Sequence, residues 1–180
     1  MVKTNPFGAL AAVGGALVAV GLLVLMLVVV EVRPAEATSP GNPGRIAHMS
    51  DQDGDLEIYT IDPTGGTPVQ LTHNTTNESF PDYSPNGREI AYAANDDTAP
   101  FESEIYKIDA TGGTPFQVTN NDTYDDHPSY SPDGRMIAYT GDDGSDFEIF
   151  YKFAHSGGKP VKLTDNPFSV DRNPSWGSGP

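Results

Sequence analysis

The 180-residue sequence contains no cysteine, so disulfide scaffolds, thiolate zinc sites, iron–sulfur clusters and cysteine nucleophiles are all excluded. Basic residues are also scarce, because ten lysines and arginines stand against 25 aspartates and glutamates, which gives a formal net charge of −15. A chain this acidic is poorly suited to neutralising phosphates. We therefore predict that it does not bind nucleic acid.

Long apolar runs are absent apart from one near the N-terminus, where residues 7–30 contain no charged residue. A helix of about 20 apolar residues spans a bilayer core, whereas cleaved signal peptides have apolar regions of about 7–15 residues. Length therefore favours a membrane anchor, although Ala35-Glu36-Ala37 has the small-x-small form of a cleavage site. Either alternative places the rest of the chain outside the cytoplasm, membrane-anchored or, if cleaved after Ala37, secreted.

The domain organisation follows from this asymmetry. Residues 1–37 are predicted to hold the signal anchor or signal peptide and the start of a tether, and residues 38–43 continue it as a linker. The first 37 residues carry two basic and two acidic residues, so the whole net charge lies on the 143 that follow. That length fits one soluble domain, which we place at residues 44–180.

Residues 44–180 contain three copies of one sequence repeat, and the copies lie 43 to 47 residues apart. Gly87-Arg88-Glu89-Ile90-Ala91-Tyr92 recurs as Gly134-Arg135-Met136-Ile137-Ala138-Tyr139 and, in shorter form, as Gly44-Arg45-Ile46-Ala47-His48. Further shared triplets are Glu57-Ile58-Tyr59, Glu104-Ile105-Tyr106 and Glu148-Ile149-Phe150, each followed by a Gly-Gly-x-Pro segment that begins at Gly65, Gly112 or Gly157. Because the motifs keep one order and nearly one period, they indicate a repeat architecture.

Each repeat contains four short runs rich in Ile, Val, Tyr, Phe and Thr, which is typical of strands. In the second unit these runs are residues 80–84, 89–93, 104–109 and 115–119, separated by turn residues such as Ser84-Pro85-Asn86-Gly87. No segment after Val30 shows a sustained helical period. Four short antiparallel strands per unit of about 40–45 residues predict an all-β fold built from β-propeller blades, three per chain.

The pattern Pro-x-Tyr/Trp-Ser-Pro-Asp/Asn-Gly-Arg-x-Ile-Ala-Tyr, followed by Glu-Ile-Tyr and Gly-Gly-x-Pro-x-x-Leu-Thr, resembles the TolB-like propeller repeat, which is also described as WD-repeat-like. The resemblance covers residues 44–177. It implies a propeller, usually six-bladed, that serves as a protein-interaction platform in the bacterial envelope. The same repeat also forms non-catalytic propellers attached to prolyl-oligopeptidase-like hydrolases.

Three blades are too few to close a ring, because propellers typically have about 4–8 blades. The repeats begin on the second strand of a blade and end on an unpaired first strand, Asn173-Pro174-Ser175-Trp176, so twelve strands are predicted. We expect a homodimer in which this last strand completes the blade that residues 45–49 begin in the other copy, closing a six-bladed ring. Trp176 aligns with Tyr83 and Tyr130 and is therefore expected to be buried. The alternative is a fragment of a larger propeller.

Catalytic chemistry is not predicted, and neither is a cofactor. The nucleophile elbow Gly-x-Ser-x-Gly is absent, and the four histidines do not recur in any grouping with serine and aspartate. Asp51, Asp53 and Asp55 have the spacing of a calcium loop, but the corresponding segments at 95–97 and 142–146 do not keep it. An ordinary strand–strand turn is therefore favoured over a metal site.

In an antiparallel blade, the loops between strands two and three and the connections between blades fall on one rim, which we call the acidic rim. Asp96, Asp97, Asp142 and Asp143 lie in these loops and are predicted to form an interaction surface for a protein partner. The bases Arg45, Arg88, Arg135 and Lys159 fall on the opposite rim, toward the membrane.

The predicted function is a non-catalytic scaffold for protein–protein interaction in the cell envelope or outside the cell. The alternative is a partial propeller of a larger enzyme, a prolyl-oligopeptidase-like hydrolase or a polysaccharide-active protein, in which it gates access of the substrate.

Overall fold

The computed structural model describes residues 44–95 and 102–177, and these residues form β-strands and turns. The strands are β1 (Ile46–Ser50), β2 (Glu57–Ile61), β3 (Val69–Gln70), β4 (Glu78–Tyr83), β5 (Glu89–Asn95), β6 (Ser103–Asp109), β7 (Phe116–Gln117), β8 (Asp125–Tyr130), β9 (Met136–Asp142), β10 (Phe147–Phe153) and β11 (Val161–Lys162).

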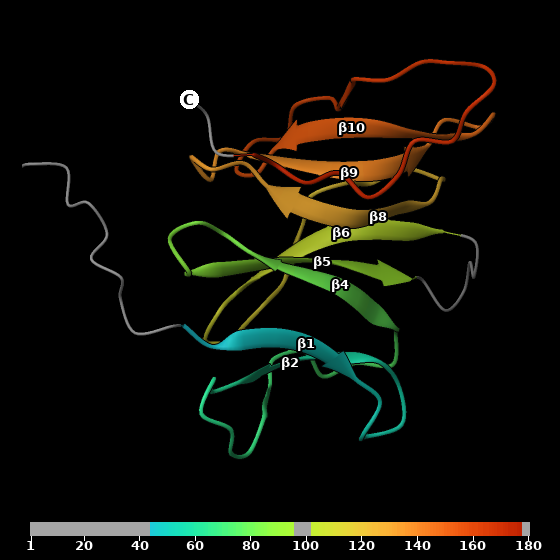
Figure 1. The fold of residues 1–180 in the computed structure, drawn as a ribbon. Helices are drawn as coiled ribbons and strands as arrows, with labels where there is room; N and C mark the ends of the chain where they lie inside the picture. Colours follow the sequence, from blue (N-terminus) through green and yellow to red (C-terminus); the bar gives the residue numbers. More distant parts are fainter. Residues whose placement is uncertain (1–43, 96–101, 178–180) are drawn as a thin grey trace, which may run out of the picture. The chain divides into compact units, whose positions relative to one another are not determined.

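The strands form three antiparallel sheets, which Figure 1 shows stacked one upon another. Blade 1 contains β1–β2–β3, blade 2 contains β4–β5–β6–β7, and blade 3 contains β8–β9–β10–β11, with every strand bonded to its neighbour in sequence. This is the predicted arrangement of propeller blades. Blade 1 has three strands because its repeat begins at the second strand position, as the alignment of the repeats indicated.

The two central strands of each blade pair in one register. Tyr92 lies opposite Tyr106 across β5 and β6, and Tyr139 lies opposite Phe150 across β9 and β10. The paired rings stack with centroids 6.0 Å and 5.8 Å apart. Such cross-strand aromatic pairs stabilise a sheet and hold its register.

Hydrophobic side chains between neighbouring blades make the core. Residues of blade 1 meet blade 2 in one cluster, and residues of blade 2 meet blade 3 in another. The first cluster contains Ile58, Leu71, Ile90, Tyr92 and Ile108, and the second contains Ala91, Ala93, Ile105, Val118, Tyr130, Ile137, Tyr139 and Ala154. Both faces of blade 2 are therefore buried, which explains why its strands do not alternate cleanly between apolar and polar residues.

The first strand of each four-stranded blade carries a bulge that breaks its ladder. The register shifts between Ser79 and Asp82 in β4 and between Asp126 and Ser129 in β8. Within these bulges Phe80 and His127 have positive φ angles of 55° and 49°, and their rings stack with centroids 3.6 Å apart. A positive φ is uncommon for bulky residues, so this recurring conformation is a specific feature of the fold.

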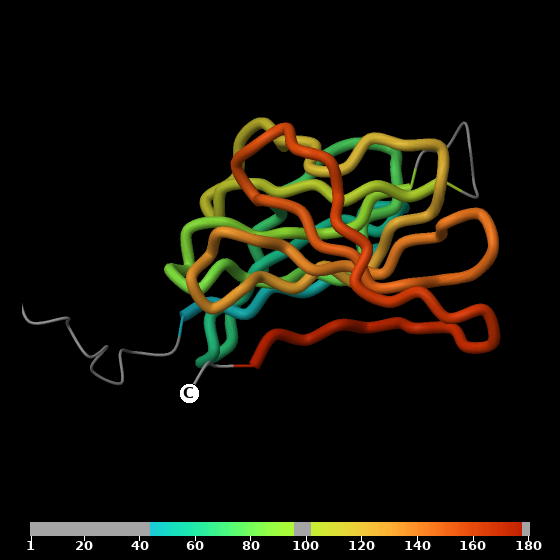
Figure 2. Tube along the Cα trace, turned by 90° about the horizontal axis from the view of Figure 1, so that it is seen from above, coloured from blue at the N-terminus to red at the C-terminus, as the bar shows by residue number. Residues whose placement is uncertain are grey.

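Residues 173–176 pair with no strand in the described part of the chain, as predicted, but they do not form the expected twelfth strand. Asn173 nonetheless has a φ of 58°, at the repeat position of Phe80 and His127. Figure 2 shows the segment running extended along the molecule. It lacks a second-strand neighbour, and Trp176 is consequently only half-buried.

The predicted anchor at residues 7–30 and the linker at 38–43 lie outside the described residues, as do residues 96–101. Within residues 44–95 and 102–177, no helix is both long enough and apolar enough to span a bilayer.

Replacing Ile105 with alanine tests the inter-blade core. Its side chain is fully buried between blades 2 and 3, so Ile105→Ala should lower the free energy of unfolding by about 2–5 kcal/mol. Val69 on an outer strand is 49% exposed, and Val69→Ala should cost less than about 1 kcal/mol. Urea unfolding followed by circular dichroism measures both, and equal losses would contradict this account of the core.

Candidate functional site

A partly buried polar cluster, which we call the clasp, recurs at the end of each blade. Asn121 lies at its centre between blades 2 and 3, where its backbone N–H donates to Glu104 Oε1 and its Nδ2 donates to Asp125 Oδ2 at 2.8 Å. Thr119 Oγ accepts the N–H of Ile105 at 2.8 Å. The same set recurs as Glu57, Thr72, Asn74 and Glu78, and again as Glu148, Thr164, Asn166 and Asp171.

Asparagine is suited to the centre of the clasp because its side chain also shapes the chain locally. Asn121 Oδ1 accepts the N–H of Thr123 at 2.8 Å, and Asn74 Oδ1 accepts the N–H of Thr76 at 2.6 Å. These are Asx turns, which reverse the chain between the last strand of one blade and the first strand of the next. The backbone and side chain of one asparagine therefore join two blades and set the connection between them.

Burial raises the pKa of three carboxyl groups of the clasp. Desolvation, together with a hydrogen bond to the carboxyl group of Glu57, raises the pKa of Glu78 to about 7. Desolvation likewise raises the pKa of Asp125 to about 7, with the negative charge of Glu104 adding to it. Desolvation also raises the pKa of Glu104 itself. In these two pairs, one carboxyl group therefore holds its proton to a higher pH than it would in water.

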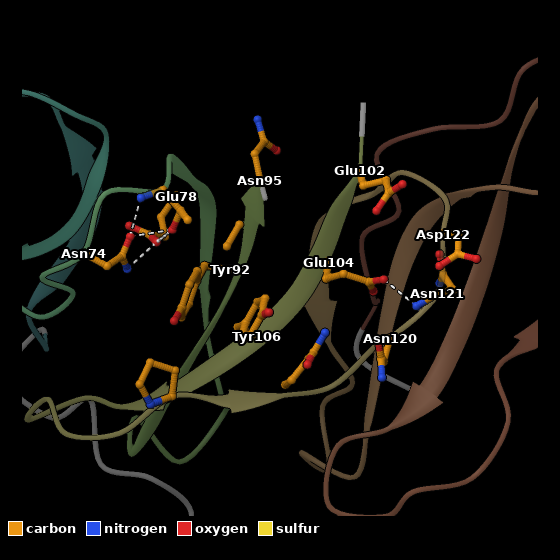
Figure 3. Close-up of a pocket in the computed structure, with 14 residues that line it drawn as sticks. Asn74, Glu78, Tyr92, Asn95, Glu102, Glu104, Tyr106, Asn120, Asn121 and Asp122 are labelled. Carbon is orange, nitrogen blue, oxygen red and sulfur yellow. Dashed lines mark hydrogen bonds between the residues drawn. The ribbon is translucent and has the colours of Figure 1, made fainter. Parts of the chain in front are cut away.

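A groove of about 460 Å³ lies on blade 2 at the acidic rim (Figure 3). Asn74 and Glu78 stand on one side, and Glu102, Glu104, Asn120, Asn121 and Asp122 stand on the other, with the rings of Tyr92 and Tyr106 between them. Gln117 and Pro115 also line it. The described residues around this groove include no lysine, arginine or histidine.

The equivalent groove of blade 3 has a volume of about 290 Å³ and contains a lysine. Lys162 occupies the repeat position of Gln117, and its Nζ lies 2.6 Å from Asp143 Oδ2 and 2.6 Å from Asp165 Oδ1. Hydrogen bonding from Lys162 lowers the pKa of Asp143 to about 2. The charges of Asp143 and Asp165 are therefore compensated from within the chain.

The predicted interaction residues have separate environments. Asp96 and Asp97 lie outside the described residues. Asp142 Oδ1 accepts the N–H of Gly144 at 2.7 Å, and Asp143 is held by Lys162. Asp142 and Asp143 thus share one loop on the acidic rim, but Asp143 carries a compensated charge.

Of the three weak calcium candidates, the structure groups Asp53 and Asp55 with the buried Glu57, with one oxygen of each within 4.8 Å of the others. Asp51 is not part of this group. Asp53 also accepts a hydrogen bond from the side chain of Gln70. The loop therefore has the hydrogen bonding of a strand–strand turn, with a carboxylate bonded to the last strand of its own blade.

On the opposite rim, a lysine, a glutamate and a histidine meet between blades 2 and 3. Lys107 Nζ lies 2.7 Å from Glu89 Oε1 and 2.7 Å from His155 Nδ1. The hydroxyl of Tyr130 donates to Glu89 Oε2 at 3.3 Å. These contacts join blades 2 and 3 on the rim that the clasp does not reach. The charges of Lys107 and Glu89 compensate each other.

Two serines at equivalent repeat positions use their hydroxyl groups to stabilise turns within blades 2 and 3. Ser84 Oγ accepts the N–H of Glu89 at 2.9 Å, and Ser131 Oγ accepts the N–H of Met136 at 3.0 Å. The one histidine close to an aspartate within residues 44–95 and 102–177 is His127, whose Nδ1 lies 2.9 Å from Asp126 Oδ1. The ring of His127 stacks on Phe80. Within residues 44–95 and 102–177, no hydrogen bond joins it to a serine.

The clasp was not anticipated from the sequence, although its signal was present. The spacing Thr-x-Asn recurs at Thr72, Thr119 and Thr164, with an acid four or five residues after each asparagine. Asparagine and threonine in a loop are most often simple turn residues. Only the fold shows that this asparagine faces two buried carboxyl groups in different blades.

Stacked antiparallel sheets of three or four strands with inter-blade cores define the described residues as part of a β-propeller. The family described as TolB beta propeller domain matches residues 30–179, and the chain belongs to this family.

Individual relatives agree with this assignment. The Tol-Pal system protein TolB of Geobacter sulfurreducens is 45% identical over 47 residues, which is 26% of this chain and 11% of that protein. A structure described as a candidate TolB from Agrobacterium tumefaciens is 28% identical with a TM-score of 0.60, covering 67% of this chain and 42% of that one. The chain thus spans less than half the length of either relative.

A puromycin-hydrolyzing peptidase of Mycobacterium tuberculosis has the same fold over 69% of this chain and 21% of its own, with a TM-score of 0.59 and 15% identity. At this identity the likeness concerns the fold alone.

The raised pKa values of the clasp predict an unusual pH dependence of stability. In the unfolded chain these carboxyl groups titrate near pH 4, whereas Glu78 and Asp125 in the folded protein titrate at about 7. The folded state therefore binds more protons between these values, and the free energy of unfolding should fall as pH rises from about 4.5 to 7. The double variant Glu78→Gln/Asp125→Asn should flatten this decline.

Urea unfolding at several pH values between 5 and 8 measures this effect. The matched control is Asp51→Asn/Asp122→Asn, which removes the same formal charge from exposed positions and should keep the decline. A wild-type protein that gains stability over this range would contradict the assignment.

Proposed function

We propose that this chain is a non-catalytic propeller scaffold that binds a protein partner on its acidic rim. The observation that carries this proposal is the excess of negative charge there. Both bases on this rim within the described residues are engaged, because Lys162 bridges two aspartates and Arg172 lies over the ring of Phe147 at 3.7 Å. Acids without such compensation are Asp51, Glu102, Asp122 and Asp146. An uncompensated charged surface attracts a partner of opposite charge.

The proposed location is outside the cytoplasm, in the cell envelope or beyond it. The apolar residues 7–30 would anchor the chain, and cleavage after Ala37 would release it. The match to the TolB beta propeller domain family supports an envelope role, since one relative is named a Tol-Pal system protein.

Charge reversal tests the acidic rim. Replacing Asp96, Asp97, Asp142 and Asp143 with lysine should abolish capture of a basic partner from an envelope extract, and binding to the wild type should weaken as salt rises. The control reverses Arg88 and Arg135 on the opposite rim, both exposed. Circular dichroism checks that both variants fold. Greater damage from the arginine changes would contradict the proposal.

We further propose that two copies close a six-bladed ring. Isoleucines at one repeat position differ in burial according to their blade. Ile46 in blade 1 is 53% exposed, whereas Ile90 in blade 2 and Ile137 in blade 3 are fully buried. At the other end, Leu163 in blade 3 is 55% exposed whereas Leu71 is 4% exposed. Ile90 packs with Leu71 between blades 1 and 2. The same contact between Ile46 of one copy and Leu163 of the other would bury both ends of the arc.

The last segment is already positioned to take part in this closure. Asn166 Nδ2 donates to Asp171 Oδ2 at 2.9 Å, and the N–H of Asp171 donates to the carbonyl of Phe147 at 2.8 Å. Glu78 is held in the same way at the start of β4. By the registers of β4 with β5 and β8 with β9, Trp176 would lie opposite Ile46 of the second copy.

Light scattering of the full chain in detergent measures the assembly. The wild type should be a dimer, and Ile46→Asp should dissociate it to monomers. Val69→Asp, at an equally exposed position of blade 1 on its outer strand, should leave the dimer intact. A monomeric wild type with native circular dichroism would refute closure by a second copy.

A further inference from the structure

The groove on blade 2 has unusual chemistry for its size. Its lining is formed by acids, carboxamides and two tyrosines, and the described residues around it contain no basic side chain. One of the acids, Glu104, is 9% exposed, and its Oε2 is buried without a hydrogen-bond partner. Its Oε1 already accepts the N–H of Asn121. The wall of the groove therefore presents acceptors, and the described residues that line it supply no cation.

The neighbouring repeat shows which cation the groove accommodates. In blade 3 the side chain of Lys162 crosses the equivalent groove and places its ammonium group between Asp143 and Asp165, 2.6 Å from each. Gln117 replaces this lysine in blade 2, and Asn120 replaces Asp165. An alkylammonium group thus fits between the last strand and the rim of a blade in this fold, and blade 2 does not supply one of its own.

The other groups of the groove suit a lysine side chain. The stacked rings of Tyr92 and Tyr106 form its floor, and aromatic rings bind the methylene chain and the ammonium group favourably. The side-chain carbonyls of Gln117 and Asn120 add neutral acceptors, and Glu102 and Asp122 supply negative charge near the opening. An ammonium group donates three hydrogen bonds, so several acceptors around it are needed.

We propose that the blade 2 groove binds the ammonium group of a lysine side chain that the protein partner presents. This rests on the proposed function, which it deepens by assigning one side chain of the partner to one site on the acidic rim. The rim attracts the partner over a distance, and the groove recognises it at one point.

A short peptide tests the site without the partner. The probe is N-acetyl-Gly-Lys-Gly-amide, titrated into the full chain in detergent while the side-chain NH₂ signals of Gln117 and Asn120 are followed by NMR. These signals should shift and saturate. The same peptide with an acetylated lysine keeps its shape but loses the charge, and it should bind at least tenfold more weakly. Equal binding of the two peptides would overturn the proposal.

Repeat-equivalent variants provide matched controls. Gln117→Lys installs the arrangement of blade 3, so its own ammonium group should fill the groove and weaken the peptide at least tenfold. Gln70→Lys adds the same charge at the same position of blade 1 and should change the affinity less than twofold. If both variants weaken the peptide equally, the peptide binds by the general charge of the rim and the groove is not its site.

A second pair of variants tests the acids. Glu102→Gln/Asp122→Asn should weaken the peptide at least tenfold, and Asp51→Asn/Asp53→Asn, outside the groove, less than twofold. The reverse order would also overturn the proposal. The proposed function fails on a different result, namely capture of the partner that is insensitive to salt and to reversal of the rim charges, which the peptide titrations do not measure.

Discussion

The arc of blades depends on the clasp, in which one asparagine binds the carboxyl groups of two neighbouring blades. Inter-blade cores are apolar and could slide, whereas the hydrogen bonds from Asn121 to Glu104 and Asp125 have one geometry. Because these carboxyl groups are buried, a shifted blade would leave them without donors at a cost of about 1–3 kcal/mol each. The clasp therefore specifies how each blade sits on the next, while the apolar side chains supply most of the stability.

The clasp also explains why the end of the described chain is ordered without a sheet. Asp171 binds Asn166 and Phe147 as Glu78 binds Asn74 and Leu56, so each blade positions the first strand of the next. The strand itself still needs a second strand beside it, which residues 173–176 do not have. Positioning and pairing are thus separate steps in this fold. Leu163 and Ile46 remain exposed at the two ends because the pairing step is missing there.

The blades were predicted well from the sequence, because the Gly-Gly and Ser-Pro-Asn-Gly turns mark the ends of strands wherever they recur. The bulges could not be predicted from the sequence, because neither phenylalanine at position 80 nor histidine at position 127 indicates a positive φ. The acids of the rim were also treated as one class. The structure separates the exposed Asp122, the buried Asp125 and the lysine-bound Asp143, and this distinction depends on contacts between residues far apart in sequence. Asp96 and Asp97 stay predictions, because they lie outside the described residues.

Comparison of the repeats separates the residues that build the propeller from those that vary within it. The glutamate, threonine and asparagine of the clasp are identical in all three copies, because each has a partner in the backbone or in the next blade. The position at the end of the last strand has no such partner in common: it is glutamine in two copies, Gln70 and Gln117, and lysine in the third, Lys162. Its side chain points into the groove, so one substitution decides whether the acids there are neutralised from within. Blades of one fold thereby present grooves of different charge, and a partner that touches several blades meets a sequence of distinct sites.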